Sequence, residues 1–151
     1  MDRAAVAAYL APRYAAYLDA TGRAATDTPD GLGPVLDDAL RYLGVASAAV
    51  PTWQGATPEA DQDALVQAAY RLMEQVVLDL GTTFNISDPG GSLQLGKMRD
   101  SAVQDRDTAR AAVMLRFGTL GIVPGATTGS PFVTLDLNYL DDEDCDDGGY
   151  A

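Results

Sequence analysis

The feature that most constrains the fold is a long amphipathic segment that begins at Thr57. Thr57 is a favourable N-cap residue, Pro58 suits the first helical position, and acidic side chains follow in the first turn, where the helix dipole favours them. The pattern ends at Gly81 and predicts a helix of about six turns at the centre of the core. Its apolar residues recur every three or four positions: Leu65, Ala69, Leu72, Val76 and Leu80.

Two shorter helices are expected before this segment. Residues 2–20 carry apolar side chains at helical spacing, and Pro12 is expected to kink or restart that helix. Residues 32–43 repeat the pattern and are closed by Gly44. Much of the apolar content is alanine, which favours helices but buries little area per residue. We expect so thin a core to gain stability by packing against further copies or a partner.

Residues 82–98 differ in character from the helices on either side. Thr83, Phe84 and Ile86 favour extended backbone, and residues 88–91 form an Asp–Pro–Gly–Gly turn sequence. Alternation of polar and apolar residues follows this turn. The sequence therefore predicts a short β-hairpin or extended loop between two helices.

The chain changes character again after Gly125. A Thr-, Gly- and Ser-rich spacer leads to an arm, residues 132–140, in which every second residue is apolar, as in a strand. Residues 141–147 then contain six acids in seven positions and are expected to be solvated. The alternation leaves open whether the arm pairs within its own chain or with a neighbour.

The predicted fold class is mainly α: a helical bundle with a short β-hairpin or extended loop and an extended C-terminal arm. A last helix is expected from about residue 100 to Gly118. At 151 residues, one core is the default. We expect a helical body over residues 1–125, with the extended loop near 82–98 inserted in it, and an arm with an acidic tail over residues 126–151.

The charge is strongly negative but unevenly spread. Twenty-two acidic against ten basic residues give a net charge of -12, which disfavours a direct grip on nucleic acid phosphates. Half of the basic residues fall in one net-positive stretch of 20 residues: Lys97, Arg99, Arg106, Arg110 and Arg116. Such polarity suits the stacking of unlike surfaces on each other.

The residue types argue against catalysis. With no histidine, the chain lacks the commonest general base and transition-metal ligand. The single cysteine, Cys145, lies in an acidic run that disfavours a thiolate, and it cannot form an intrachain disulfide. We therefore predict no enzyme, no catalytic residue and no cofactor. No apolar run is long enough to span a membrane, and we expect a chain made in the cytosol without membrane contact.

Two further groups of residues have competing interpretations. Asp142, Asp144 and Asp146 alternate as calcium ligands do, but the glycine and glutamate of an EF-hand loop are missing, so no metal site is predicted. The aromatic residues of the first third are expected to pack the core, with an interface between copies as the alternative. These residues are Tyr9, Tyr14, Tyr17, Tyr42 and Trp53.

The order of these parts resembles the small head-to-tail connector, or adaptor, proteins of tailed bacteriophages. The likeness is architectural and covers roughly residues 57–118, with one long alanine-rich helix, a glycine-containing extended loop and a second amphipathic helix. In that family the loop and the C-terminal segment pack around a ring on the portal. The matching positions here are Leu93, Leu95 and Lys97 in the loop and Phe132, Val133, Leu135, Leu137 and Tyr139 in the arm, which would bind the partner.

The resemblance implies a structural protein of the virion neck, assembled in the bacterial cytoplasm. Copies would form a ring of about twelve under the portal protein and contact further neck or tail proteins. DNA would pass through the channel without specific binding, because an acidic wall repels phosphates. Arg99, Arg106 and Arg110 would form a charged docking face for acidic portal surfaces.

Two other classes of protein remain open. The net charge also fits an acidic regulatory protein or nucleic-acid mimic that binds a basic partner. An enzyme that uses carboxylates and a divalent metal is the weakest alternative, because it needs a cleft that holds at least two inward-facing aspartates.

Overall fold

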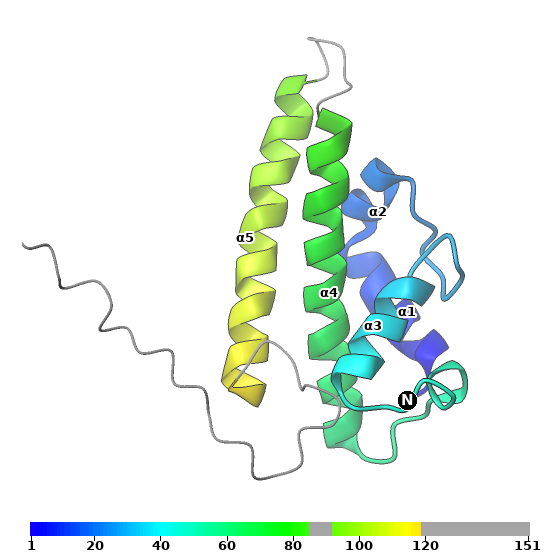
Figure 1. Cartoon of the computed structure of the whole chain (residues 1–151). Coiled ribbons are helices and arrows are strands. Elements are labelled where there is room, and N and C mark those ends of the chain that lie inside the picture. The colour runs from blue at the N-terminus through cyan, green and yellow to red at the C-terminus, as the bar shows by residue number, and fades with distance from the viewer. Residues whose placement is uncertain (85–91, 119–151) are drawn as a thin grey trace, which may run out of the picture.

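The computed structural model describes residues 1–84 and 92–118, which form a mainly helical bundle (Figure 1). This part of the chain contains no β-strand, and its one isolated β-bridge joins Asp2 to Gln54. The mainly α class predicted from the sequence is confirmed. The elements are α1 (Arg3–Arg13), α2 (Ala15–Thr21), α3 (Gly33–Tyr42), the 3₁₀ turn η1 (Val50–Thr52), α4 (Pro58–Phe84) and α5 (Ser92–Phe117).

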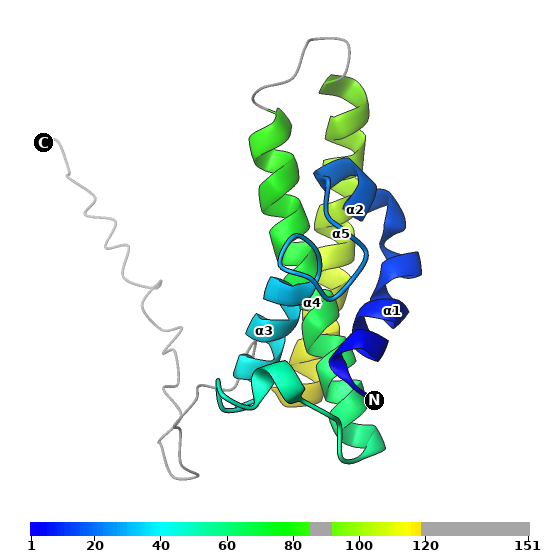
Figure 2. The same cartoon turned by 90° about the vertical axis from the view of Figure 1, so that its right-hand side faces the viewer.

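Helix α4 is the centre of the molecule, as the sequence predicts. It packs against α5 on one side and against α1, α2 and α3 on the other (Figures 1 and 2). Its start follows the predicted cap, because the Ala60 N–H donates to the Thr57 hydroxyl at 3.2 Å. Glu59 and Asp61 lie in the first turn.

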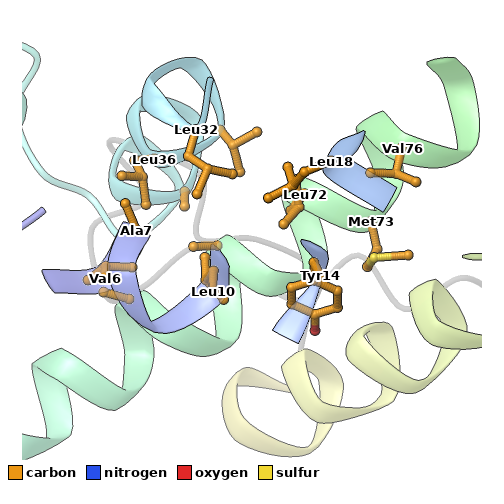
Figure 3. Close-up of a cluster of buried hydrophobic side chains, with 14 of the residues drawn as sticks. Val6, Ala7, Leu10, Tyr14, Leu18, Leu32, Leu36, Leu72, Met73 and Val76 are labelled. Atoms are coloured by element: carbon orange, nitrogen blue, oxygen red, sulfur yellow. The ribbon is translucent and has the colours of Figure 1, made fainter. Parts of the chain in front are cut away.

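The core fills the space between α4 and the three short helices. Figure 3 shows side chains from α1, α2, α3 and α4 converging on one another. Buried alanines contribute little volume, so leucines supply most of the large side chains of this core. The fully buried leucines are Leu10, Leu18, Leu32, Leu36, Leu40, Leu72 and Leu80.

The first helical segment is interrupted near Pro12, as expected. Pro12 lies in the last turn of α1, where its ring removes a backbone donor, and Tyr14 then leaves helical geometry before α2 begins. The chain reverses after α2 at Gly22, whose φ of 68° favours glycine. Gly44, with a φ of 81°, follows α3 in the same way.

The prediction of an extended loop over residues 82–98 is wrong wherever the structure describes it. Helix α4 continues through Gly81 to Phe84, since one internal glycine costs only about 1 kcal/mol and packing against α5 outweighs it. Helix α5 begins at Ser92, well before the expected start near residue 100. The turn predicted at residues 88–91 lies outside the described residues, as does the arm.

Arg3 ties three segments of the chain to the start of α1. Its guanidinium donates two hydrogen bonds to the Asp27 carboxylate, at 2.8 and 3.0 Å, and one to the Val50 carbonyl at 3.1 Å. It also pairs with Asp37 on α3. The pKa of Arg3 is raised, chiefly by the hydrogen bond to Asp27. One side chain thus connects α1, the loop after α2, α3 and η1.

Candidate functional site: interaction surfaces beside α5

Two grooves lie on opposite sides of the α4–α5 hairpin. One is bordered by α1, and we call it the aromatic groove. The other is bordered by α3, and we call it the charged groove. Both grooves, formed by described residues, are open to solvent.

The aromatic groove encloses about 270 Å³ between α1, α4 and α5. Its lining from α4 and α5 is largely apolar, whereas Arg13 and Gln62 are exposed and make its rim polar. Tyr9 is 52% exposed, an unusual degree for so large an aromatic side chain. The lining residues are Tyr9, Leu10, Arg13, Tyr14, Gln62, Leu65, Val66, Ala69, Asp105, Thr108, Ala109 and Ala112.

A hydrogen bond between α2 and α5 fixes one side of this groove. The Tyr17 hydroxyl donates to the Asp105 carboxylate at 2.7 Å, and Asp105 also lines the groove. Burial, followed by this hydrogen bond to a charged acceptor, raises the pKa of Tyr17 to about 12. The neutral phenol is therefore the stable form here at physiological pH, and it holds α5 in place against the short helices.

The charged groove is larger, about 710 Å³, and its cations face carboxylates. Arg71 stacks on Tyr42, with its guanidinium carbon 3.6 Å from the ring centroid, and pairs with Glu74 at 2.6 Å. Arg23, which lines the groove, pairs with Asp79 of α4 at 2.7 Å. Arrangements of this kind fix the surface in shape and favour a polar partner.

The three arginines predicted to form a docking face do share one flank of α5. Arg99, Arg106 and Arg110 are seven and four positions apart, a spacing that aligns them on a helix. Arg106 lines the charged groove and pairs with Asp107 at 2.7 Å. Among the described residues, Arg99 and Arg110 form no ion pair. Whether this flank docks on a partner remains a prediction.

The end of α5 also exposes large apolar side chains. Leu115 is 90% exposed and Met114 is 43% exposed. Leu115 lies one turn after Ala112, so it extends the apolar surface of the aromatic groove toward the end of the helix. Exposed apolar residues next to an open groove are typical of surfaces that another chain covers.

The loop residues predicted to contact a partner lie in helix α5 and not in an extended loop. Leu95 lies in α5 and packs, half-buried, against the core, so its first role is structural. Lys97 is exposed on the same helix. Leu93 lies in the first turn of α5. The arm residues Phe132, Val133, Leu135, Leu137 and Tyr139 lie outside the described residues.

The aromatic residues divide between core and surface. Tyr14 is buried, and Tyr17 and Trp53 are half-buried against the core. Tyr9 and Tyr42 are exposed, each beside one of the two grooves. The expectation of core packing is therefore right for the first three and wrong for the other two.

The aromatic groove itself was not foreseen from the sequence. It forms where α1 and α5 both border one face of α4, and the approach of α1 to α5 has no local signal. One available hint was the row of small residues Ala109 and Ala112, which lie one turn apart and leave space beside a helix.

Comparison with known proteins adds no relative. No protein-family model matches the chain, and no curated protein or solved structure is significantly similar to it.

Within the described residues, no three acidic, histidine or cysteine side chains gather as metal ligands do. None of the described helices is long and apolar enough to cross a membrane.

Proposed function

We propose that this chain is a structural head–tail connector, or adaptor, of a tailed bacteriophage, which forms a ring under the portal. The observation that carries the proposal is the exposure of α5. Of its described side chains only Ala102 and Val113 are buried, although the helix is 26 residues long. A helix at the edge of a bundle with Leu115 and Met114 exposed presents apolar surface for another chain to cover.

Unlike surfaces on one subunit support a ring rather than a two-fold dimer. The aromatic groove has an apolar part and a rim of mixed charge, while the arginine flank is basic and lies on the other side of the α4–α5 hairpin. Contacts between unlike patches are head-to-tail, and they close into a ring when the rotation permits. Burial of one leucine of this kind contributes about 1.5–3 kcal/mol to such a contact.

The proposed mechanism is mechanical. Each arm, residues 132–140, would contact a neighbouring subunit or the portal, and the arginine flank would dock on acidic portal surfaces. The net charge of -12 would keep the channel wall from binding the phosphates of passing DNA.

The test is assembly with the portal protein encoded in the same genome. Negative-stain imaging and native mass spectrometry of the mixture should detect a ring of this chain on the portal. A chain that binds no portal ring under any assembly condition would contradict the proposal. A monomer in isolation would not, because assembly on a template is expected. A portal or capsid gene next to the gene for this chain would support it.

A pair of matched variants makes the assembly test specific. Leu115→Glu should reduce ring formation on the portal about tenfold or more, since it places a charge in the contact. Gln104→Glu adds the same charge at another exposed position of α5 and should assemble normally. Equal assembly by the two variants would show that the exposed end of α5 is not the contact.

The charge distribution also favours a second candidate function, the binding of a basic partner by an acidic protein. Residues 119–151 contain seven of the 22 acids and none of the ten basic residues. If the protein acts in this way, substitution of the six acids of residues 141–147 by their amides should abolish salt-sensitive binding to basic host proteins. If the protein is a connector, the same variant should keep most of its ability to assemble on the portal.

A further inference from the structure

We propose that the aromatic groove is the docking site for residues 132–139 of the same chain. These residues would lie along the groove and insert the apolar side chains of alternate positions between α1 and α5. The proposal concerns the isolated protein and does not depend on the connector function.

The chemistry of the groove matches that of the segment. The apolar residues that line the groove include Leu65 and Ala69, and its volume of about 270 Å³ leaves room for apolar side chains of a ligand. In an extended segment, alternate side chains point to one face. That face would carry Val133, Leu135, Leu137 and Tyr139, and the other face Thr134, Asp136 and Asn138.

The groove is lined by one charge of each sign, Arg13 and Asp105, and the Asp105 carboxylate accepts a hydrogen bond from the Tyr17 hydroxyl. Arg13 lines the groove and forms no ion pair among the described residues. The segment contains Asp136 and is followed directly by the six acids of residues 141–147. An acidic peptide beside an arginine whose charge is not already paired is favourable. The charged groove is a poorer receptor, because its Arg23 and Arg71 already pair with carboxylates.

The length of the tether favours docking in the same chain over docking in a second copy. Ala112, which lines the groove, is six residues before Gly118, or about 9 Å along the helix. Thirteen residues lie between Gly118 and Phe132, and the fourteen Cα–Cα steps from one to the other can span up to about 50 Å. A short flexible tether holds its ligand at an effective concentration of about millimolar, far above the concentration of free copies.

Disulfide trapping in the full-length protein tests the proposal. In a Cys145→Ser background, Ala112→Cys is combined either with Leu135→Cys, which should face the groove, or with Thr134→Cys, which should face away. Ala112 is exposed, so its substitution leaves the core intact. Under mild oxidation the Leu135→Cys pair should close about tenfold faster than the control, as a monomer. Equal rates, or a product that is only dimeric, would overturn docking within the chain.

A second measurement covers the case in which cysteine itself weakens docking. Leu135→Asp with Leu137→Asp should shift the backbone amide signals of Ala109 and Ala112 in NMR spectra of the full-length protein. Thr134→Asp with Asn138→Asp adds the same charge on the other face and should leave these signals in place. If both double variants leave the groove signals unchanged, the segment does not occupy the groove.

Discussion

At the scale of single residues, we expect Arg3 to contribute more to stability than an exposed ion pair does. Its side chain is only 11% exposed, and it satisfies two carboxylates and a backbone carbonyl at once. Most exposed ion pairs contribute little, whereas a partly buried cation that is removed leaves its carboxylates without a partner. Arg3 is thus a structural residue, and it was not singled out from the sequence.

We expect Arg3→Ala to lower the free energy of unfolding by about 2–3 kcal/mol, because Asp27 and Asp37 lose their shared donor. Urea denaturation followed by circular dichroism measures this change. Arg41→Ala is the control, since Arg41 is exposed and its nearest carboxylate, on Asp38, is 3.8 Å away. Its effect should stay within about 0.5 kcal/mol. Similar effects of the two variants would contradict the role given to Arg3.

The raised pKa of Tyr17 predicts that the folded protein loses stability at high pH. Its pKa is about 12 in the folded protein against an ordinary value of 10.0. The unfolded chain therefore ionises first, so the stability from this group is complete below pH 10 and is lost as the pH rises toward 12. Tyr17→Phe should cost about 1 kcal/mol at pH 7. It should also make the loss of stability above pH 10 shallower.

Unfolding free energies measured at several pH values between 7 and 12 test this expectation. Burial also raises the pKa values of Tyr14 and Tyr70, and both residues are present in the wild type and in Tyr17→Phe. The difference between the pH curves of these two proteins therefore reports on Tyr17 alone. Tyr9→Phe is the control at pH 7, because its exposed hydroxyl bonds to no described residue. Parallel pH curves for wild type and Tyr17→Phe would exclude this contribution.

At the scale of elements, the sequence predicts the helix boundaries that capping residues and glycines mark better than those that depend on packing between helices. Thr57 and Pro58 marked the start of α4 because capping chemistry is local. The end of α4 and the start of α5 depended on their packing against each other, which no local pattern reports. Leu95, Met98 and Ala102 do recur at helical spacing, and this pattern was hidden by the alternation of residues 92–95.

The contact between α4 and α5 depends on small side chains. Ala102 is fully buried in this contact, so Ala102→Leu should overpack it and cost about 1–3 kcal/mol. Ala111→Leu adds the same side chain to the same helix at an exposed position and should change stability by less than about 0.5 kcal/mol. Thermal unfolding of both variants gives the comparison. A stable Ala102→Leu protein would mean that α5 packs more loosely than described.

At the scale of the whole molecule, α4 contacts each of the other α-helices of the described part of the chain, so we expect this part to unfold as one cooperative unit. Trp53 lies in the segment beside α1 and α3, while most of the helical content lies in α4 and α5. We expect tryptophan fluorescence and circular dichroism to give the same urea midpoint, because both parts share the buried face of α4. Separate midpoints would show that α5 unfolds independently.

The same cooperativity sets the cost of a cavity in α4. Leu72 is fully buried between α4 and the short helices, and Leu72→Ala should cost about 2–5 kcal/mol and shift both probes together. Leu78→Ala removes an exposed leucine from the same helix and should have little effect. A mild Leu72→Ala phenotype would place the stabilising contacts elsewhere.

The central position of α4 also has a consequence for synthesis on the ribosome. Residues 1–57 are made first, yet the apolar faces of α1, α2 and α3 are covered mainly by a helix that comes later in the chain. The 27 residues of α4 take about 1–5 s to translate at bacterial and eukaryotic elongation rates. During that interval the apolar faces of α1, α2 and α3 lack the helix that covers them, so we expect the first third of the chain to be prone to aggregation until α4 has emerged.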